Sequence, residues 1–203
     1  MDWYVVDKNY INYLTQFDSR VGYVEYGERL KLHVGIHLTI GDFHYYVPIS
    51  SAKPKHQKMS NSLDFHKLQD ESTGYLYAVL NINNMIPVPD NCLTQLKYNQ
   101  VESFRSFSNE KERIDYIYLL QKEKALIDNV QDSLQNKAMK LYQKCIAKPD
   151  SSLAARCCNF KMLEEKCSSF YDGISSVIVW SRKSSRISRA VLQSFFIRFW
   201  YLV

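Results

Sequence analysis

Apolar and polar residues alternate one by one over residues 31–40, and this period of two predicts a half-buried β-strand. Gly41 and Asp42 predict a tight turn, after which residues 43–49 return as an antiparallel partner strand. Shorter apolar segments typical of strands are residues 3–6, 63–68, 75–82 and 85–88. The first half of the chain therefore predicts a small, mostly antiparallel sheet.

The second half of the chain has the spacing of helices. Asn109, with Glu112 three residues later, is a capping-box candidate, and no proline or glycine follows before Pro149. This predicts one long helix, or two helices in line. Helices are also expected at residues 8–17 and 160–170, and a helix with a connection at residues 93–107. The predicted fold class is α+β: a small antiparallel sheet or partial barrel with helices packed against it.

Charge is distributed unevenly along the chain. The 203 residues carry a formal net charge of +5, but no acidic residue follows Asp172, whereas five basic residues do. Residues 1–172 therefore hold 21 basic and 21 acidic side chains. Any affinity of this main body for nucleic acid must come from a local patch of cations.

The last 31 residues differ in composition from the rest, and they fit neither a clear strand nor a capped helix. Two interpretations stay open. Residues 173–203 could form a basic amphipathic membrane anchor, or they could be translated vector or shifted-frame sequence foreign to the fold. We therefore expect a single domain over residues 1–172, followed by a separate tail.

Cysteine and histidine spacing gives no indication of a metal site. The five cysteines are odd in number and form no CxxC pair, and no secretory signal opens the chain, which is typical of reduced thiols in a cytoplasmic protein. His33 and His37 share a strand face but are too far apart to hold one ion unless His44 approaches. No acidic cluster has two-metal nuclease spacing, and no stretch is apolar enough to span a bilayer. We expect no metal and no cofactor.

Residues 45–56 carry the clearest candidate chemistry. This segment begins as a strand, breaks at Pro48, and continues as a loop because Pro54 disfavours both strand and helix. The loop presents two hydroxyls, two ammonium groups and an imidazole, which suit the binding of a phosphate: Ser50, Ser51, Lys53, Lys55 and His56. Antiparallel pairing across the Gly41–Asp42 turn should bring Lys31 beside them. Serine pairs in loops often do no more than cap a turn.

Four blocks in order give the chain a family resemblance: residues 31–36, 46–56, 81–88 and 158–165. Together they resemble the ToxN/AbiQ family, the endoribonuclease toxins of type III toxin–antitoxin and phage abortive-infection systems. The resemblance extends over the whole main body, to about residue 171. It implies a partly open β-barrel related to the MazF and Kid toxins, with added helices.

The resemblance also implies an activity and a partner. The activity is metal-independent cleavage of adenine-rich RNA by attack of a ribose 2′-hydroxyl, which leaves a 2′,3′-cyclic phosphate and a 5′-hydroxyl. The partner is a small repeated RNA, folded as a pseudoknot, that lies across the active groove and assembles with the protein into closed rings. Cellular or phage RNA would be the substrate, in the cytoplasm, with no membrane involved.

Catalytic roles transfer onto four positions by this resemblance. Ser51 and Lys53 fall on the family's catalytic serine and lysine, Lys31 on its strand lysine, and Tyr26 on its loop tyrosine. Ala52 departs from the pattern, because proline is common there. The general base stays open between Tyr26, His56 and a lysine of depressed pKa.

A second hypothesis uses the same residues without catalysis. A non-catalytic RNA-binding module could hold RNA through the lysines near Ser51 and through aromatic side chains that stack on unpaired bases. The two hypotheses differ in whether new RNA ends appear.

Overall fold

The computed structural model describes residues 1–22 and 34–170 of the chain. Tyr26, Lys31 and the whole predicted tail lie outside the described residues. The chain divides into two compact units, residues 1–167 and 168–203, and all the strands described below belong to the first. No helix within the described ranges is long and apolar enough to cross a membrane.

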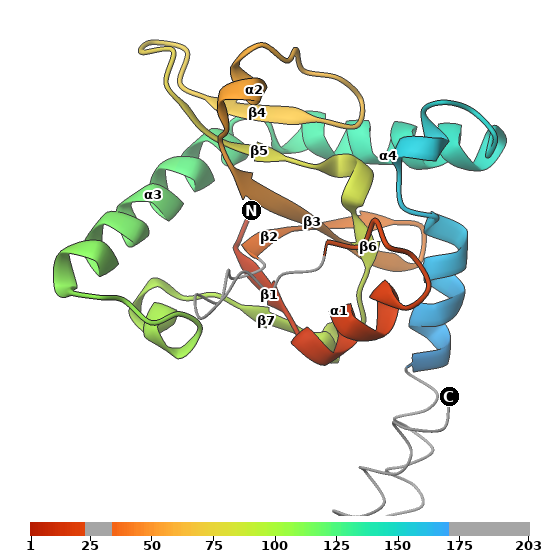
Figure 1. The fold of residues 1–203 in the computed structure, drawn as a ribbon, viewed down its shortest axis with the longest axis horizontal. Helices are drawn as coiled ribbons and strands as arrows, with labels where there is room; N and C mark the ends of the chain where they lie inside the picture. The colour runs from red at the N-terminus through yellow and green to blue at the C-terminus, as the bar shows by residue number, and fades with distance from the viewer. Residues whose placement is uncertain (23–33, 171–203) are drawn as a thin grey trace, which may run out of the picture. The chain divides into compact units, whose positions relative to one another are not determined.

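The first unit is built on an antiparallel sheet of seven strands that does not close on itself (Figure 1). Along the sheet the order is β4-β5-β3-β2-β1-β7, and β6 pairs with β3. The strands are β1 Tyr4–Val6, β2 Val34–Ile40, β3 Phe43–Ser51, β4 His66–Gln69, β5 Leu76–Leu80, β6 Ile86–Pro87 and β7 Leu93–Gln95. The predicted α+β class with an antiparallel sheet is thus confirmed.

The helices predicted near residues 8–17, 109–146 and 160–170 are confirmed, whereas the short helix at Pro54–Gln57 was not predicted. The helices are α1 Lys8–Thr15, α2 Pro54–Gln57, α3 Glu110–Asp128, α4 Gln131–Ala147 and a helix over residues 160–170. Short 3-10 turns are Ile82–Asn84, Asp90–Cys92, Tyr98–Ser103 and Ala154–Arg156.

The Asn109 side chain accepts the N–H of Glu112 at 2.9 Å and so caps α3. The Glu112 carboxylate accepts the N–H of Ser108, not of Asn109, so the second bond of the predicted capping box is replaced. The long segment forms two helices rather than one, and α3 and α4 meet at an angle rather than in line (Figure 1).

Strand β3 is the element that positions the site. It pairs with β2 from the Gly41–Asp42 turn as far as Pro48, and then with β5 through its last three residues. The prediction that Pro48 breaks the strand is therefore wrong. Pro48 lies opposite the end of β5, where its carbonyl accepts the N–H of Asn81 at 3.2 Å. No ladder pair on that side needs the missing proline N–H, so the strand continues.

The helix expected within residues 93–107 is also wrong. Residues 93–95 form β7, which pairs with β1 through Tyr4↔Gln95, and a 3-10 turn follows. A three-residue strand is too short to show a period of two. Its structure comes from the free edge of β1, which gives its backbone groups partners.

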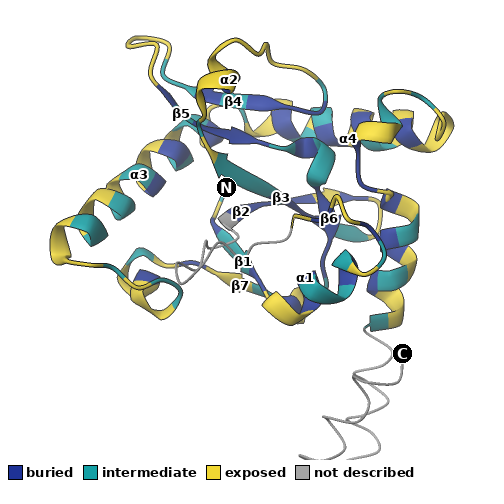
Figure 2. Ribbon diagram, viewed as in Figure 1, coloured by how far each residue is buried: buried dark blue, intermediate teal, exposed yellow. Residues whose placement is uncertain are grey.

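The core lies between the sheet and the inner faces of the helices (Figure 2). It contains a buried carboxylate, Glu164, which accepts the hydroxyls of Tyr45 at 2.9 Å and Tyr142 at 2.7 Å. Lys161 pairs with its other oxygen at 2.9 Å. Because a buried charge is tolerated only when it is paired and hydrogen-bonded, this arrangement fixes the last helix against β3 and α4.

A second buried carboxylate, Glu123 on α3, receives no hydrogen bond from the residues that the structure describes, and its side chain is 5% exposed. Burial raises the pKa of Glu123 from 4.5 to about 7. Because the folded protein holds the Glu123 proton more tightly than the unfolded chain, this group contributes stability that is fully present below about pH 4.5. That contribution is lost as the pH rises through about 7.

We therefore expect Glu123→Gln to change the free energy of unfolding differently at the two pH values. The difference between variant and wild type should be more favourable to the variant at pH 8 than at pH 4.5, by up to about 3 kcal/mol. Urea unfolding at the two pH values measures this difference. Glu71→Gln, at an exposed site in the β4–β5 turn, is the matched control. A Glu123→Gln effect that is equal at both pH values would contradict the assigned cause.

Candidate functional site

Ser50 and Ser51 are the last residues of β3, not loop residues as the sequence predicted. They pair with Val79 and Ala78 of β5. The Ser50 hydroxyl accepts the side-chain N–H of Asn81 at 2.9 Å, and this bond holds it in place. Ser51 is exposed, and no described residue bonds to its hydroxyl. Strand pairing therefore fixes the backbone of Ser51 and leaves its hydroxyl free for a ligand.

Lys53 is exposed and directly precedes α2. The sequence predicted a loop here, but Pro54 occupies the first turn of a short helix, where its missing N–H costs no hydrogen bond. The Lys53 carbonyl accepts the N–H of His56 at 2.8 Å, and the Lys53 N–H donates to Nδ1 of His56 at 3.2 Å. The backbone that carries the Lys53 ammonium is therefore held from both sides.

His56 is buried, with its side chain packed against Phe65 at 5.7 Å between ring centroids. Burial lowers the pKa of His56, and the neighbouring Lys55 and Lys53 ammonium groups lower it further. Since Nδ1 accepts the Lys53 N–H, the neutral ring carries its proton on Nε2. The imidazole acceptor is already in use, which favours a positioning role for His56 over the general-base role considered from the sequence.

Ala52 sets the directions of its two neighbours. It packs against a small buried cluster of Phe65, Leu76 and Val79. The backbone stays extended through Lys53, at φ −125° and ψ 156°. Because side chains alternate along an extended chain, Ser51 and Lys53 share the face opposite Ala52. A hydroxyl and a cation thus project together from the end of β3, an arrangement that can hold a phosphate.

Lys55 lies on the exposed surface of α2, two residues beyond Lys53, and adds a second cation to this end of β3. The predicted approach of Lys31, and the place of Tyr26, concern residues outside the described ranges. We keep the name "β3 end" for the group Ser51, Lys53 and Lys55.

Two histidines approach each other elsewhere on the sheet. His37 and His44 lie diagonally across the β2–β3 ladder, with ring centroids 4.5 Å apart. Asp90 Oδ1 lies 3.6 Å from Nε2 of His44. Burial lowers the pKa of His37, with a further contribution from His44. Within the described residues, no group of three or more histidine, cysteine or acidic side chains could hold a metal ion.

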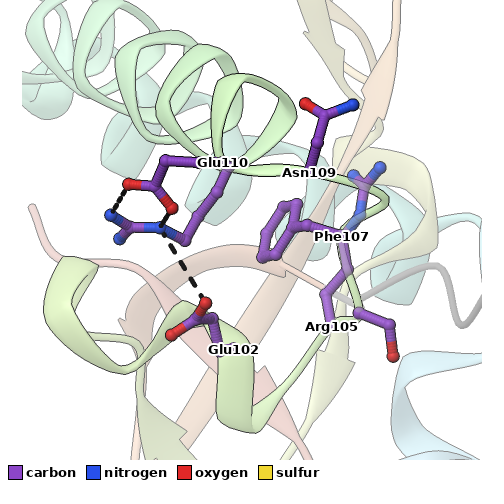
Figure 3. A pocket seen from close by; sticks show the side chains of 7 residues that line it. Glu102, Arg105, Phe107, Asn109 and Glu110 are labelled. Carbon is purple, nitrogen blue, oxygen red and sulfur yellow. Dashed lines mark hydrogen bonds and ion pairs between the residues drawn. The ribbon is translucent and has the colours of Figure 1, made fainter.

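A pocket of 360 Å³ opens at the start of α3 (Figure 3). Arg113 there pairs with Glu110 at 2.8 Å and approaches Glu102 at 3.9 Å. Arg105 lies over the Phe107 ring at 5.2 Å and bonds to Glu112. Since carboxylates already neutralise both guanidinium groups, this pocket does not favour a phosphate, and the β3 end is the better candidate.

Comparison with known proteins places the chain among toxins. The family model described as "Toxin ToxN, type III toxin-antitoxin system" matches residues 2–168. Endoribonuclease AbiQ of Lactococcus lactis subsp. lactis is 28% identical over 173 residues, which cover 81% of this chain and 86% of that protein. Endoribonuclease ToxN of Bacillus thuringiensis subsp. kurstaki is 27% identical over 175 residues, 83% of each chain.

A solved structure agrees with this assignment. It comes from a type III toxin–antitoxin system in which a non-coding RNA pseudoknot inhibits the toxin selectively. It aligns with a TM-score of 0.67 and 28% sequence identity, and the alignment covers 84% of this chain and 97% of that one. Because the family model matches residues 2–168, most of this chain, the chain belongs to the ToxN family of type III toxin–antitoxin toxins.

Proposed function

We propose that this chain is an endoribonuclease toxin of a type III toxin–antitoxin and phage abortive-infection system. The observation that carries the proposal is the shared face of Ser51 and Lys53, both exposed at the end of β3. By the resemblance, these positions would be the family's catalytic serine and lysine. The curated relatives are named endoribonucleases. Residues 1–172 would form the catalytic domain.

The proposed reaction is an internal transesterification. A ribose 2′-oxygen loses its proton to a base and bonds to the adjacent phosphorus. The bond from phosphorus to the 5′-oxygen breaks, and that oxygen takes up a proton. The products are a 2′,3′-cyclic phosphate and a 5′-hydroxyl. Water is not a reactant in this step, and the proposed reaction uses no metal or cofactor.

The residues of the β3 end would divide this work. The Lys53 ammonium stabilises the negative charge that the phosphorus centre gains, an effect that a preorganised backbone strengthens. Ser51 orients the phosphate, and Lys55 contacts the RNA backbone, with Ser50 and His56 holding the segment. Lys31 would add a third cation. With the His56 acceptor in use, Tyr26 or a lysine is the better candidate for the base.

The partner would be a small repeated RNA folded as a pseudoknot. The aligned structure supports the pseudoknot, since it comes from a system in which a non-coding RNA pseudoknot inhibits the toxin. By the same resemblance we propose a closed protein–RNA ring, cleavage at adenine-rich sites in the cytoplasm, and a sheet related to the partly open barrels of MazF and Kid.

Incubation of the purified protein with a long single-stranded RNA separates this function from a non-catalytic binding module. The ribonuclease produces discrete fragments that accumulate with time. A binding module shifts the RNA on a native gel and leaves it intact at every protein concentration. Intact RNA under these conditions would overturn the proposed function.

A further inference from the structure

Two tyrosines on the β4–β5 hairpin have no role in the fold described so far. Tyr75 is 61% exposed, the largest exposure among the large hydrophobic side chains of the described residues, and Tyr77 is half-buried. Their rings meet edge to face, with centroids 4.6 Å apart and an angle of 73° between planes. An exposed aromatic pair of this kind contributes little to a core, so its position on the surface calls for an explanation.

The hairpin that carries these rings is well ordered by hydrogen bonds. The Asp70 carboxylate accepts the N–H groups of Ser72 and Thr73 at 2.8 and 3.0 Å. The Asp70 N–H donates to the Tyr75 carbonyl at 2.9 Å and closes the turn, while Gly74 supplies the positive φ of 69°. A ligand that stacks on Tyr75 therefore meets a backbone that is already in place.

The strand register puts Tyr75 and Tyr77 beside the β3 end. Strand β5 pairs with β3 as far as Ser51↔Ala78. In the antiparallel direction, Tyr77 and Leu76 are the next residues of β5, and Tyr75 directly precedes the strand. Continued by one or two residues, this register runs toward Ala52 and Lys53. The β4–β5 hairpin reaches past the end of β3 (Figure 1).

A β-bulge decides which face the tyrosines occupy. On the other side of β5, Leu68 pairs with Ala78 but Gln69 pairs with Leu76, so Tyr77 is an extra residue. The bulge lets Leu76 and Val79, three positions apart, pack in one cluster with Ala52. Since side chains alternate next to Leu76 and the Tyr75 and Tyr77 rings contact each other, both tyrosines belong on the opposite face. That is also the face of Ser51 and Lys53.

We propose that Tyr75 and Tyr77 form a stacking platform for an unpaired base of single-stranded RNA, next to the phosphate held at the β3 end. This inference rests on the proposed function. Stacking of a base on an aromatic ring strengthens binding by roughly tenfold to a hundredfold, whichever base it is. The platform would therefore position the strand for cleavage, and the choice of cleavage sequence would lie with other contacts.

The test uses a 2′-O-methyl oligoadenylate with one 2-aminopurine, which lacks the attacking hydroxyl and so reports binding alone. Tyr75→Leu with Tyr77→Leu should weaken its Kd about tenfold or more and abolish the fluorescence quenching that stacking causes. Cleavage of a matched RNA should show a raised KM and an almost unchanged kcat. Phenylalanine at both positions keeps the ring faces and should restore binding and quenching.

Tyr118→Leu is the control, because Tyr118 on α3 is 56% exposed and belongs to neither the hairpin nor β3. If the wild-type protein cleaves RNA but the double leucine variant binds and quenches as wild type does, the platform is wrong and the proposed function stands. If the wild-type protein neither cleaves RNA nor binds the oligonucleotide, the proposed function itself fails. An equal loss in the Tyr118→Leu control would also overturn the platform.

Discussion

Replacement of Lys53 by alanine is expected to slow RNA cleavage by about 100-fold to 1000-fold, the usual effect of removing one preorganised donor from a developing oxyanion. The Lys53 side chain is exposed, so the fold should not depend on it. Its backbone N–H bonds to His56 whatever the side chain is, and α2 should survive the change. RNA binding should persist, because Lys55 and the tyrosines of the hairpin are still present.

Single-turnover cleavage rates measure this effect, and circular dichroism checks the fold. Lys58→Ala removes the same charge from an exposed residue just after α2 and serves as the matched control. We expect its cleavage rate to stay within about twofold of wild type, since a solvated lysine outside the site gains little in the transition state. Cleavage by Lys53→Ala at the wild-type rate would remove Lys53 from the catalytic site.

Gly35→Ala is expected to destabilise the protein by about 3 kcal/mol or more, at the upper end of what overpacking costs. A Cβ atom at Gly35 would lie 2.2 Å from the carbonyl oxygen of Val47 and 2.6 Å from the Tyr46 ring. Neither neighbour can give way. Val47 belongs to the β2–β3 ladder, and Tyr46 is fully buried. Gly35 pairs with Pro48, so the same change should disturb the β3 end and reduce activity.

Urea unfolding of the purified variants tests this prediction, with soluble yield as the measure if Gly35→Ala does not fold. Gly22→Ala is the control, since a Cβ atom there meets no atom of the described residues within 4 Å. It should leave the unfolding midpoint nearly unchanged. Equal midpoints for Gly35→Ala and wild type would show that β2 and β3 can separate enough to admit a methyl group.

Local signals in the sequence explain the parts of the fold that were predicted correctly. The β2–β3 hairpin follows from the alternation before Gly41, and the start of α3 follows from Asn109 three residues before Glu112. Pro48 and residues 93–95 were misassigned because their structure depends on partners far along the chain. The sequence shows that Pro48 lacks an N–H, but it does not show whether a neighbouring strand would need that N–H as a hydrogen-bond donor.

The same limit applies to the site. The hydroxyls and lysines of residues 45–56 pointed to Ser51 and Lys53, and the family resemblance predicts their catalytic roles. What the sequence could not show is that Ala52 anchors them in a buried cluster, or that His56 binds the Lys53 N–H. The place of Tyr77 depends on a bulge opposite Leu68 and Gln69, and the register of two strands cannot be read from either one alone.

The most direct test of the central claim is the chemical identity of the RNA ends that the wild-type protein leaves in excess EDTA. Our account predicts discrete cuts in an adenine-rich single-stranded RNA, each with a 2′,3′-cyclic phosphate on one fragment and a 5′-hydroxyl on the next. Fragments with 5′-phosphates, or cleavage that stops when EDTA removes metal ions, would contradict internal attack by the 2′-hydroxyl at Ser51 and Lys53.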